Sequence, residues 1–316
     1  MKPVEVWPAT EAPQLREQLA QHGAPVLLKG LVAAWPAVQA GREAPLGICD
    51  YLGRFDRGVE VFATKTRASA RGVMGYNDTL TDCAFVKARM TLAEFMGHLQ
   101  AYLPAARAPA IAAQCAKVSE VIPGFLDDNH LPAWPDVTPN FWLGNALTVP
   151  VHHDHPHNLA CVVAGRRRFT LFPPQEVGNL YIGSLEHTPS GAPISVVHPV
   201  SPDFDRYPRY RDALQAAMVA ELSPGDALYI PPLWFHQVEA LEKVNLLVNY
   251  WWPVSAAPDL PSPAATLLQA IRVLNGMPPA QREAWAAMFD HYVVQRDIDP
   301  AAHIPEAWQG ALARRR

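Results

Sequence analysis

Four histidines and one aspartate lie within six residues, from His152 to His157, and these side chains bind metal ions. On an extended strand alternate side chains share a face, so His152 and Asp154 are expected to project together while His153 points away. One imidazole and one carboxylate on one face supply two ligands of a facial triad, which binds Fe(II) and leaves coordination positions open. The segment therefore predicts part of a metal site.

The third ligand has to come from another strand. His236 ends the segment Pro231-Pro232-Leu233-Trp234-Phe235-His236, which follows a turn and a short apolar run from Gly225 to Ile230. Strands far apart in the chain meet in a barrel, so this histidine is the best candidate. We predict that His152, Asp154 and His236 bind one metal ion.

Two other interpretations of these residues remain. His153, His155 and His157 share the opposite parity, but Pro156 interrupts their strand and no acidic residue follows at the spacing of H-x-H cupin sites. A zinc hydrolase could also use a His, Asp and His set.

An arginine cluster follows the histidines. Arg166, Arg167 and Arg168 come after a glycine, and by strand parity only Arg167 shares a face with the apolar Phe169 and Leu171. An inward guanidinium needs an anion. A dicarboxylate such as 2-oxoglutarate would supply one, bound by both prongs of the guanidinium. The alternatives are an exposed arginine or one paired with a protein carboxylate.

The surrounding pattern indicates the elements that would hold these residues. Short apolar runs separated by Gly and Pro recur over 141–252, which favours a β-barrel or sandwich, and 180–210 resembles a long polar insertion. The first 150 residues mix helical and strand signals, including a helix over 91–103 that starts with a Thr91 to Glu94 capping box. The last sixty residues have helical apolar spacing.

We accordingly expect a mainly β chain with α extensions. The expected parts are an N-terminal α/β region that buttresses the barrel (1–120), a catalytic barrel (121–256) and a helical extension that is a candidate dimerisation element (257–316).

Composition excludes several classes of protein. With 316 residues, 49% of them hydrophobic and 18% charged, the chain can bury a sizeable core. A net charge of −4 argues against bulk binding to nucleic acid or anionic membrane, and no apolar stretch reaches membrane-spanning length. The N-terminus has no signal-peptide pattern, and the four scattered cysteines, without a C-x-x-C pair, fit a cytoplasmic protein.

The motifs, taken in order, resemble the JmjC (cupin-like) family of Fe(II)- and 2-oxoglutarate-dependent oxygenases. The family pattern is H-x-D, Asn, Gly-x-Lys/Arg and an L-F-P-P turn, followed by G-D-x-L-Y-I-P-x-x-W-x-H and V-N-F/Y-W. This chain carries it at His152–Asp154, Asn158, Gly165–Arg167, Leu171–Pro174, Gly225–His236 and Val248–Trp251. Segments 25–30, 35–37, 281–285 and 289–292 extend the likeness to most of the chain, which within the family is similar to the asparaginyl hydroxylases.

The resemblance implies a fold, a reaction and a set of site residues. The fold would be a double-stranded β-helix, or jelly-roll barrel. The reaction would couple decarboxylation of 2-oxoglutarate to hydroxylation of a C–H bond, in a protein side chain or a small molecule. Two chains would associate through the last helices. The implied residues are His152, Asp154 and His236 for Fe(II), and Arg167, Asn158 and Asn249 for the cosubstrate.

Two departures from the family pattern weaken the expectation of 2-oxoglutarate. Ile111 stands where relatives often have a tyrosine, and Val149 stands three residues before the first iron ligand, where they often have Thr or Ser. Two hydrogen-bond donors to the cosubstrate are therefore missing. Either Arg167 compensates or the pocket takes a different acid. A metal-dependent hydrolase or isomerase without 2-oxoglutarate, and a non-catalytic binding module, stay open, as do the roles of His153, His155 and His157.

Overall fold

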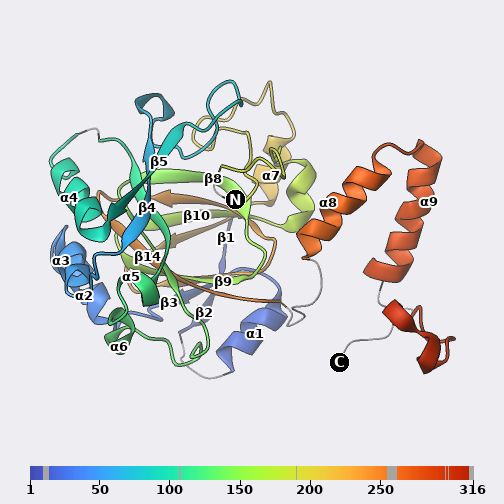
Figure 1. The fold of residues 1–316 in the computed structure, drawn as a ribbon, viewed down its shortest axis with the longest axis horizontal. Coiled ribbons are helices and arrows are strands. Elements are labelled where there is room, and N and C mark those ends of the chain that lie inside the picture. The colour runs from blue at the N-terminus through green and yellow to red at the C-terminus, as the bar shows by residue number, and fades with distance from the viewer. Residues whose placement is uncertain are drawn as a thin grey trace. The chain divides into compact units, whose positions relative to one another are not determined.

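In the computed structural model, the described residues are 1–9, 14–106, 108–189, 191–254, 262–295, 297 and 299–312. The chain divides into two units, Met1–Ala256 and Ala257–Arg316, and each has its own elements (Figure 1). No described helix has the length and apolar character needed to cross a membrane.

The strands of the first unit form two sheets in the described part of the chain. The five-stranded sheet has the order β1-β11-β10-β13-β8. Its strands are β1 Lys2–Pro3, β11 Met218–Leu222, β10 Arg167–Phe172, β13 Phe235–Ala240 and β8 Leu147–His153. Only the β1–β11 pair in it is parallel.

The second sheet has nine strands in the order β2-β3-β12-β9-β14-β7-β6-β4-β5. Its strands are β2 Glu5–Pro8, β3 Val26–Lys29, β12 Ala227–Ile230, β9 His157–Ala164, β14 Asn245–Trp252, β7 Asn140–Gly144, β6 Ile111–Lys117, β4 Glu60–Thr66 and β5 Phe85–Thr91. Strands from the first 120 residues are thus continuous with the barrel strands of the same sheet.

A hydrophobic core joins the two sheets. Phe169 and Leu171 of β10 pack with Ala160 and Val162 of β9, and both pairs are spaced by two residues, as expected for side chains on one face of a strand. The outward-facing Arg168 of β10 is solvated. This arrangement confirms the predicted jelly-roll barrel with additional helices.

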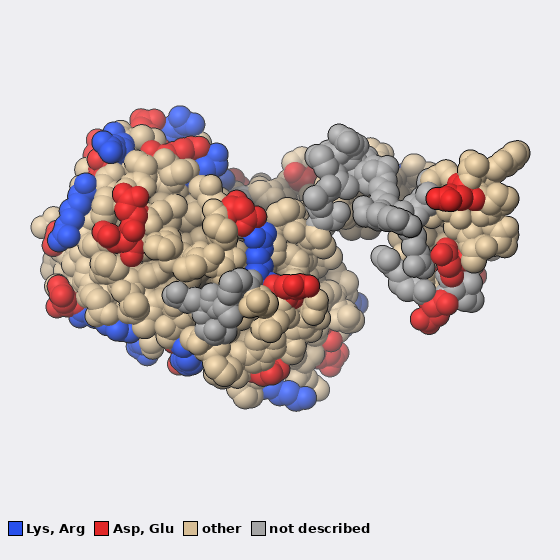
Figure 2. Space-filling model, turned by 90° about the horizontal axis from the view of Figure 1, so that it is seen from below, with Lys and Arg blue, Asp and Glu red and all other residues tan. Residues whose placement is uncertain are grey.

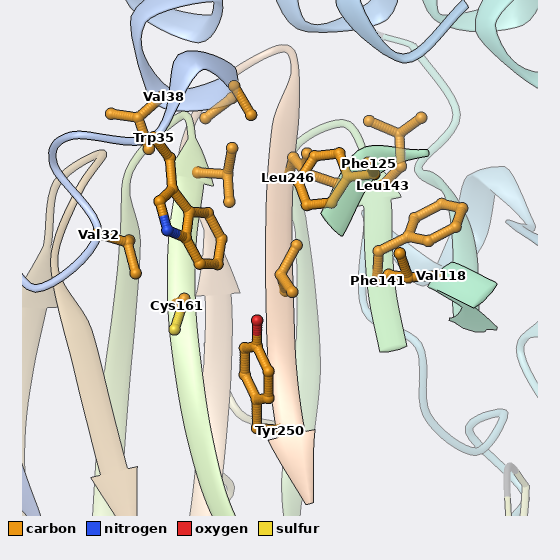
Figure 3. Close-up of a cluster of buried hydrophobic side chains, with 14 of the residues drawn as sticks. Val32, Trp35, Val38, Val118, Phe125, Phe141, Leu143, Cys161, Leu246 and Tyr250 are labelled. Atoms are coloured by element: carbon orange, nitrogen blue, oxygen red, sulfur yellow. The ribbon is translucent and has the colours of Figure 1, made fainter. Parts of the chain in front are cut away.

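Helices cover the other face of the nine-stranded sheet. They are α1 Leu15–His22, α2 Pro36–Glu43, α3 Gly47–Gly53, α4 Leu92–Tyr102, α5 Val118–Val121 and α6 Phe125–Asp128. Figure 3 shows the result: Phe125 from the helical side lies beside Leu143 and Leu246 from the strands, and Trp35 lies beside Cys161 of β9. Helix α4 begins with the expected capping box, because Thr91 Oγ1 accepts from the Glu94 amide at 3.2 Å and the Glu94 carboxylate accepts from the Thr91 amide at 2.8 Å.

The G-D turn before β12 is structural. Asp226 is buried, and its carboxylate accepts hydrogen bonds from the amides of Gly30 at 3.0 Å and Ser223 at 2.9 Å. Lys29 adds an ion pair at 2.8 Å. The turn therefore fixes the end of β3 beside β12, which pairs with β9, the strand that follows the histidine segment.

The insertion between β10 and β11 begins with a 3-10 turn, Pro174–Gly178, and ends in helix α7, Tyr210–Ala216. Between them the described chain has single bridges instead of strands, including Ile194 to His152. Leu180 and Val197 of the insertion pack on Phe172 and Phe235. The insertion is thus anchored beside the end of the barrel that carries His152.

The second unit contains helices α8 Pro263–Leu274 and α9 Pro279–Phe289, then a π-helical turn Asp290–Val294. No described residue of these three elements is buried, and several are large and apolar: Leu267 is 55% exposed and Trp285 is 47% exposed. The described residues of the second unit do not bury these faces.

We predict that Gly165→Ala destabilises the fold by about 3 kcal/mol, because alanine disfavours a left-handed backbone and has no room there. Gly165 has φ of +70°, and an added Cβ would lie 2.6 Å from the Val244 carbonyl oxygen. Urea unfolding followed by circular dichroism measures the effect. Gly97→Ala in α4, where nothing lies within 4 Å, is the control and should stabilise the chain by up to about 1 kcal/mol. Equal stability of the Gly165 variant and the native chain would contradict the prediction.

Candidate metal centre and cosubstrate site

The three proposed metal ligands come together at one end of the barrel. His152 on β8 and His236 on β13 are directly opposite each other in antiparallel register, and Asp154 comes just after β8. One ligand atom from each lies within 4.8 Å of the others, and the His236 Nε2 to Asp154 Oδ2 distance is 3.7 Å. Among the described residues, no other group of three such side chains has this geometry.

Hydrogen bonds orient both imidazoles. Nδ1 of His152 lies 2.8 Å from the Pro150 carbonyl oxygen, and Nδ1 of His236 lies 3.0 Å from that of Trp234. Because a carbonyl oxygen only accepts, each Nδ1 carries the proton and each Nε2 keeps its lone pair for a metal. Burial also lowers the pKa of His236, which favours the neutral form that metals bind.

Two side-chain amides, which we call the amide line, connect Trp142 to the Asp154 carboxylate through hydrogen bonds. Asn158 Nδ2 donates to Asp154 Oδ2 at 3.2 Å, Asn249 Nδ2 donates to Asn158 Oδ1 at 3.4 Å, and Trp142 Nε1 donates to Asn249 Oδ1 at 2.9 Å. The two asparagines expected near the metal and cosubstrate therefore orient Asp154, as outer hydrogen bonds do for metal ligands.

Arg167 is a buried cation without a counter-ion among the described ion pairs. Only 7% of it is exposed, Nη2 makes a 3.4 Å hydrogen bond to the Trp142 carbonyl, and Nε has no partner. The adjacent arginines differ: Arg166 pairs with Glu242 and Arg168 with Glu221 on the surface. Burial lowers the pKa of Arg167 to about 10, so it stays charged at neutral pH. A buried, unpaired charge is costly, and a carboxylate ligand would offset that cost.

The two departures from the family pattern lie in different surroundings. Ile111 packs in the core on the helix-covered face of the nine-stranded sheet, whereas Val149 borders the cavity next to His152. Gln114, three residues after Ile111, also borders this cavity, and its Oε1 accepts from Thr64 Oγ1 at 3.0 Å. Val149 therefore places an apolar side chain at the cavity wall, at the position where the family resemblance implies a Thr or Ser hydroxyl.

A cavity of about 560 Å³ opens onto His152 and Asp154. Its described lining is Phe62, Thr64, Lys87, Gln114, Cys115, Trp142, Val149, His152, His153, Asp154, His155, Pro156, Gly191, Ala192, Pro193 and Trp251. The sequence did not predict the cavity wall that β4, β5 and β6 form. The two-residue alternation in these strands was the available signal, but it does not reveal which sheet face borders a cavity.

The remaining histidines separate into two environments. His153 and His155 line the cavity, with ring centroids 5.4 Å apart. His157 is buried elsewhere, where its Nδ1 lies 2.8 Å from the Tyr229 hydroxyl and its ring stacks on Trp252. The alternative set of His153, His155 and His157 does not converge.

Comparisons with known proteins agree on one family. The model of the cupin-like domain matches residues 12–257. The chain is 34% identical over 140 residues to "Lysine-specific demethylase JMJ31" of Arabidopsis thaliana, covering 44% of this chain and 24% of that protein. It is 31% identical over 192 residues to the human "Bifunctional peptidase and (3S)-lysyl hydroxylase JMJD7", covering 52% and 58% respectively. It is also 36% identical over 112 residues to human "HSPB1-associated protein 1", covering 35% and 22%. These matches therefore cover from 22% to 58% of the relatives' own lengths.

We predict that Arg167→Met weakens 2-oxoglutarate binding about 10- to 100-fold, the value of a buried charge-assisted hydrogen bond, and leaves metal content unchanged. Isothermal titration calorimetry of the Mn(II)-loaded protein measures the affinity for 2-oxoglutarate, and elemental analysis measures the metal content. Arg168→Met, which removes a surface arginine paired with Glu221, is the matched control and should bind normally. Native affinity in the Arg167 variant would refute this assignment.

Proposed function

We propose, from the premise that the chain belongs to the cupin-like domain family, that it is an Fe(II)- and 2-oxoglutarate-dependent oxygenase that hydroxylates a substrate C–H bond. The observation that carries this proposal is the convergence of His152, Asp154 and His236, with ligand atoms within 4.8 Å, in a barrel that also buries the unpaired Arg167. Two imidazoles and one carboxylate on one side of an ion are the donor set of non-haem iron oxygenases.

The chain's own residues position the reactants. When bound, the iron supplies dioxygen activation, and 2-oxoglutarate supplies electrons as it is converted to succinate and carbon dioxide. His152, Asp154 and His236 would hold the ion, with Asn158 fixing the carboxylate. Arg167 would bind the far carboxylate of the cosubstrate.

We further propose a protein side chain as the substrate, because two relatives are named as a lysyl hydroxylase and a lysine-specific demethylase. Similarity to the asparaginyl hydroxylases stays a prediction. The net charge of −4, with interspersed positive and negative side chains on the face in Figure 2, supports a partner other than nucleic acid or membrane. The four free thiols support a cytoplasmic location. The division into a buttress (1–120), a catalytic core (121–256) and a helical extension (257–316) is part of the same proposal.

A hydrolase or isomerase that does not use 2-oxoglutarate is the second candidate. The apolar Val149 at the cavity wall favours it, since a hydroxyl there would help to bind the cosubstrate. Such an enzyme would turn over without dioxygen. A non-catalytic binding module would bind its partner equally well after His152→Ala and Asp154→Ala and would have no turnover.

We predict that the purified chain, supplied with Fe(II) and dioxygen, converts 2-oxoglutarate to succinate, and that Asp154→Ala lowers this rate at least 100-fold, since the charged ligand is lost. Succinate is measured by mass spectrometry. The control is Asp136→Ala, which removes an exposed carboxylate paired with Arg16. Undetectable succinate from the iron-loaded native chain would exclude the oxygenase.

We also propose that the chain forms a homodimer through 257–316. The exposed apolar faces of α8 and α9 support this, because uncovered patches of this kind mark interaction sites. We predict that Leu267→Glu converts the dimer to a monomer, as judged by light scattering after gel filtration. Glu283→Lys changes a residue of α9 whose side chain is already charged, so it serves as a control that should remain dimeric. A monomeric native chain would refute the proposal.

A further inference from the structure

One face of the β4–β5 hairpin forms a wall of the cavity. The strands pair in antiparallel register, with Phe62 opposite Arg89 and Thr64 opposite Lys87. Because side chains of opposite residues share a face, these four lie together, and three of them line the cavity that opens onto His152 and Asp154.

Lys87 brings an ammonium group to this wall. Its Nζ donates to the Pro189 carbonyl oxygen at 2.8 Å and lies 5.8 Å from the Phe85 ring centroid. An ammonium has three donors, so two remain for a ligand. No described carboxylate forms an ion pair with Lys87 within 4.0 Å.

No negative charge among the described groups of the loaded cavity is left to neutralise the ammonium of Lys87. Asp154 is the only carboxylate in the described lining, and the proposed function assigns it to the metal. A divalent ion, Asp154, a dicarboxylate cosubstrate and Arg167 together have no net charge. The ammonium of Lys87 therefore gives the loaded cavity a net positive charge, apart from any on the histidines, and a ligand entering it meets that charge.

The same wall offers a surface for a peptide. Phe62 is 56% exposed although it is aromatic, and the Arg89 guanidinium lies 4.5 Å from its ring centroid. An exposed aromatic beside cations can pack on a neighbouring residue of a bound chain.

We infer that the substrate is a peptide carrying an acidic side chain, whose carboxylate binds Lys87 at the cavity mouth while an adjacent residue packs on Phe62. This inference rests on the proposed function, since the cavity is the entrance to the proposed metal centre. Peptides with lysine or arginine at that position are repelled, which sets this chain apart from an enzyme that acts on a lysine in a basic sequence.

A positional-scanning peptide library tests the inference through binding alone. The full chain is loaded with Zn(II), which does not activate dioxygen, and saturated with 2-oxoglutarate, and metal content is verified before binding is measured. The native chain should enrich Asp and Glu over Lys and Arg at least tenfold at one peptide position. The Lys87 ammonium attracts the carboxylates of Asp and Glu and repels the cations of Lys and Arg. Lys87→Glu should abolish or invert that preference, whereas Lys87→Arg should preserve it.

The control variant is Lys65→Glu, an equal charge change on β4 whose lysine faces Tyr102 instead of the cavity. It should keep the acidic preference. The library is then repeated on the native and Lys87→Glu chains without metal. A difference in peptide preference between these two chains does not depend on metal binding, so it tests the inference about the substrate separately from the proposed function. Failure to load Zn(II) counts against the proposed function. No acidic preference, or one that Lys87→Glu leaves intact, overturns the inference about the substrate.

Discussion

The packing of two imidazoles against one carboxylate at the open end of the barrel is the constraint on which the site depends. His236 is buried and faces His152 across an antiparallel pair, with ring centroids 4.3 Å apart. Backbone carbonyls hold Nδ1 of both rings, and Nε2 of His236 lies 3.7 Å from Asp154 Oδ2. Three electron-pair donors held this close disfavour one another unless a cation lies between them, so the geometry is one that a metal ion would stabilise.

The rest of the first unit keeps these groups in place. The antiparallel register of β8 and β13 sets the distance between the histidines, and the pairing of β13 with β10 fixes the strand that carries Arg167. The Asp226 turn and the helix-covered core support the nine-stranded sheet, and the core around Phe169 and Leu171 packs this sheet against the five-stranded one. The amide line through Asn249 and Asn158 connects that larger sheet to Asp154.

Local pattern was enough to predict the β-rich region, the capped helix and the candidate ligands, whereas the jelly-roll barrel followed from the family resemblance. His152 lies on β8 and Asp154 follows it by two residues, so parity alone predicted that they share a face. The same rule distinguished Arg167 from Arg166 and Arg168, which form surface ion pairs. Parity could not reveal the cavity wall, because Phe62 and Lys87 reach it only through pairing between strands distant from β8 in sequence. Nor could it show that Ile111 faces the helix-covered core, since burial on either face of that sheet leaves the same apolar pattern.

The central claim is that one ion binds to His152, Asp154 and His236. Anomalous diffraction at the iron edge, from crystals grown with Fe(II) without oxygen, tests it most directly. One strong peak is expected about 2 Å from Nε2 of each histidine and from a carboxylate oxygen of Asp154. A peak held by His153 and His155 instead, or no peak within reach of all three residues, would contradict it.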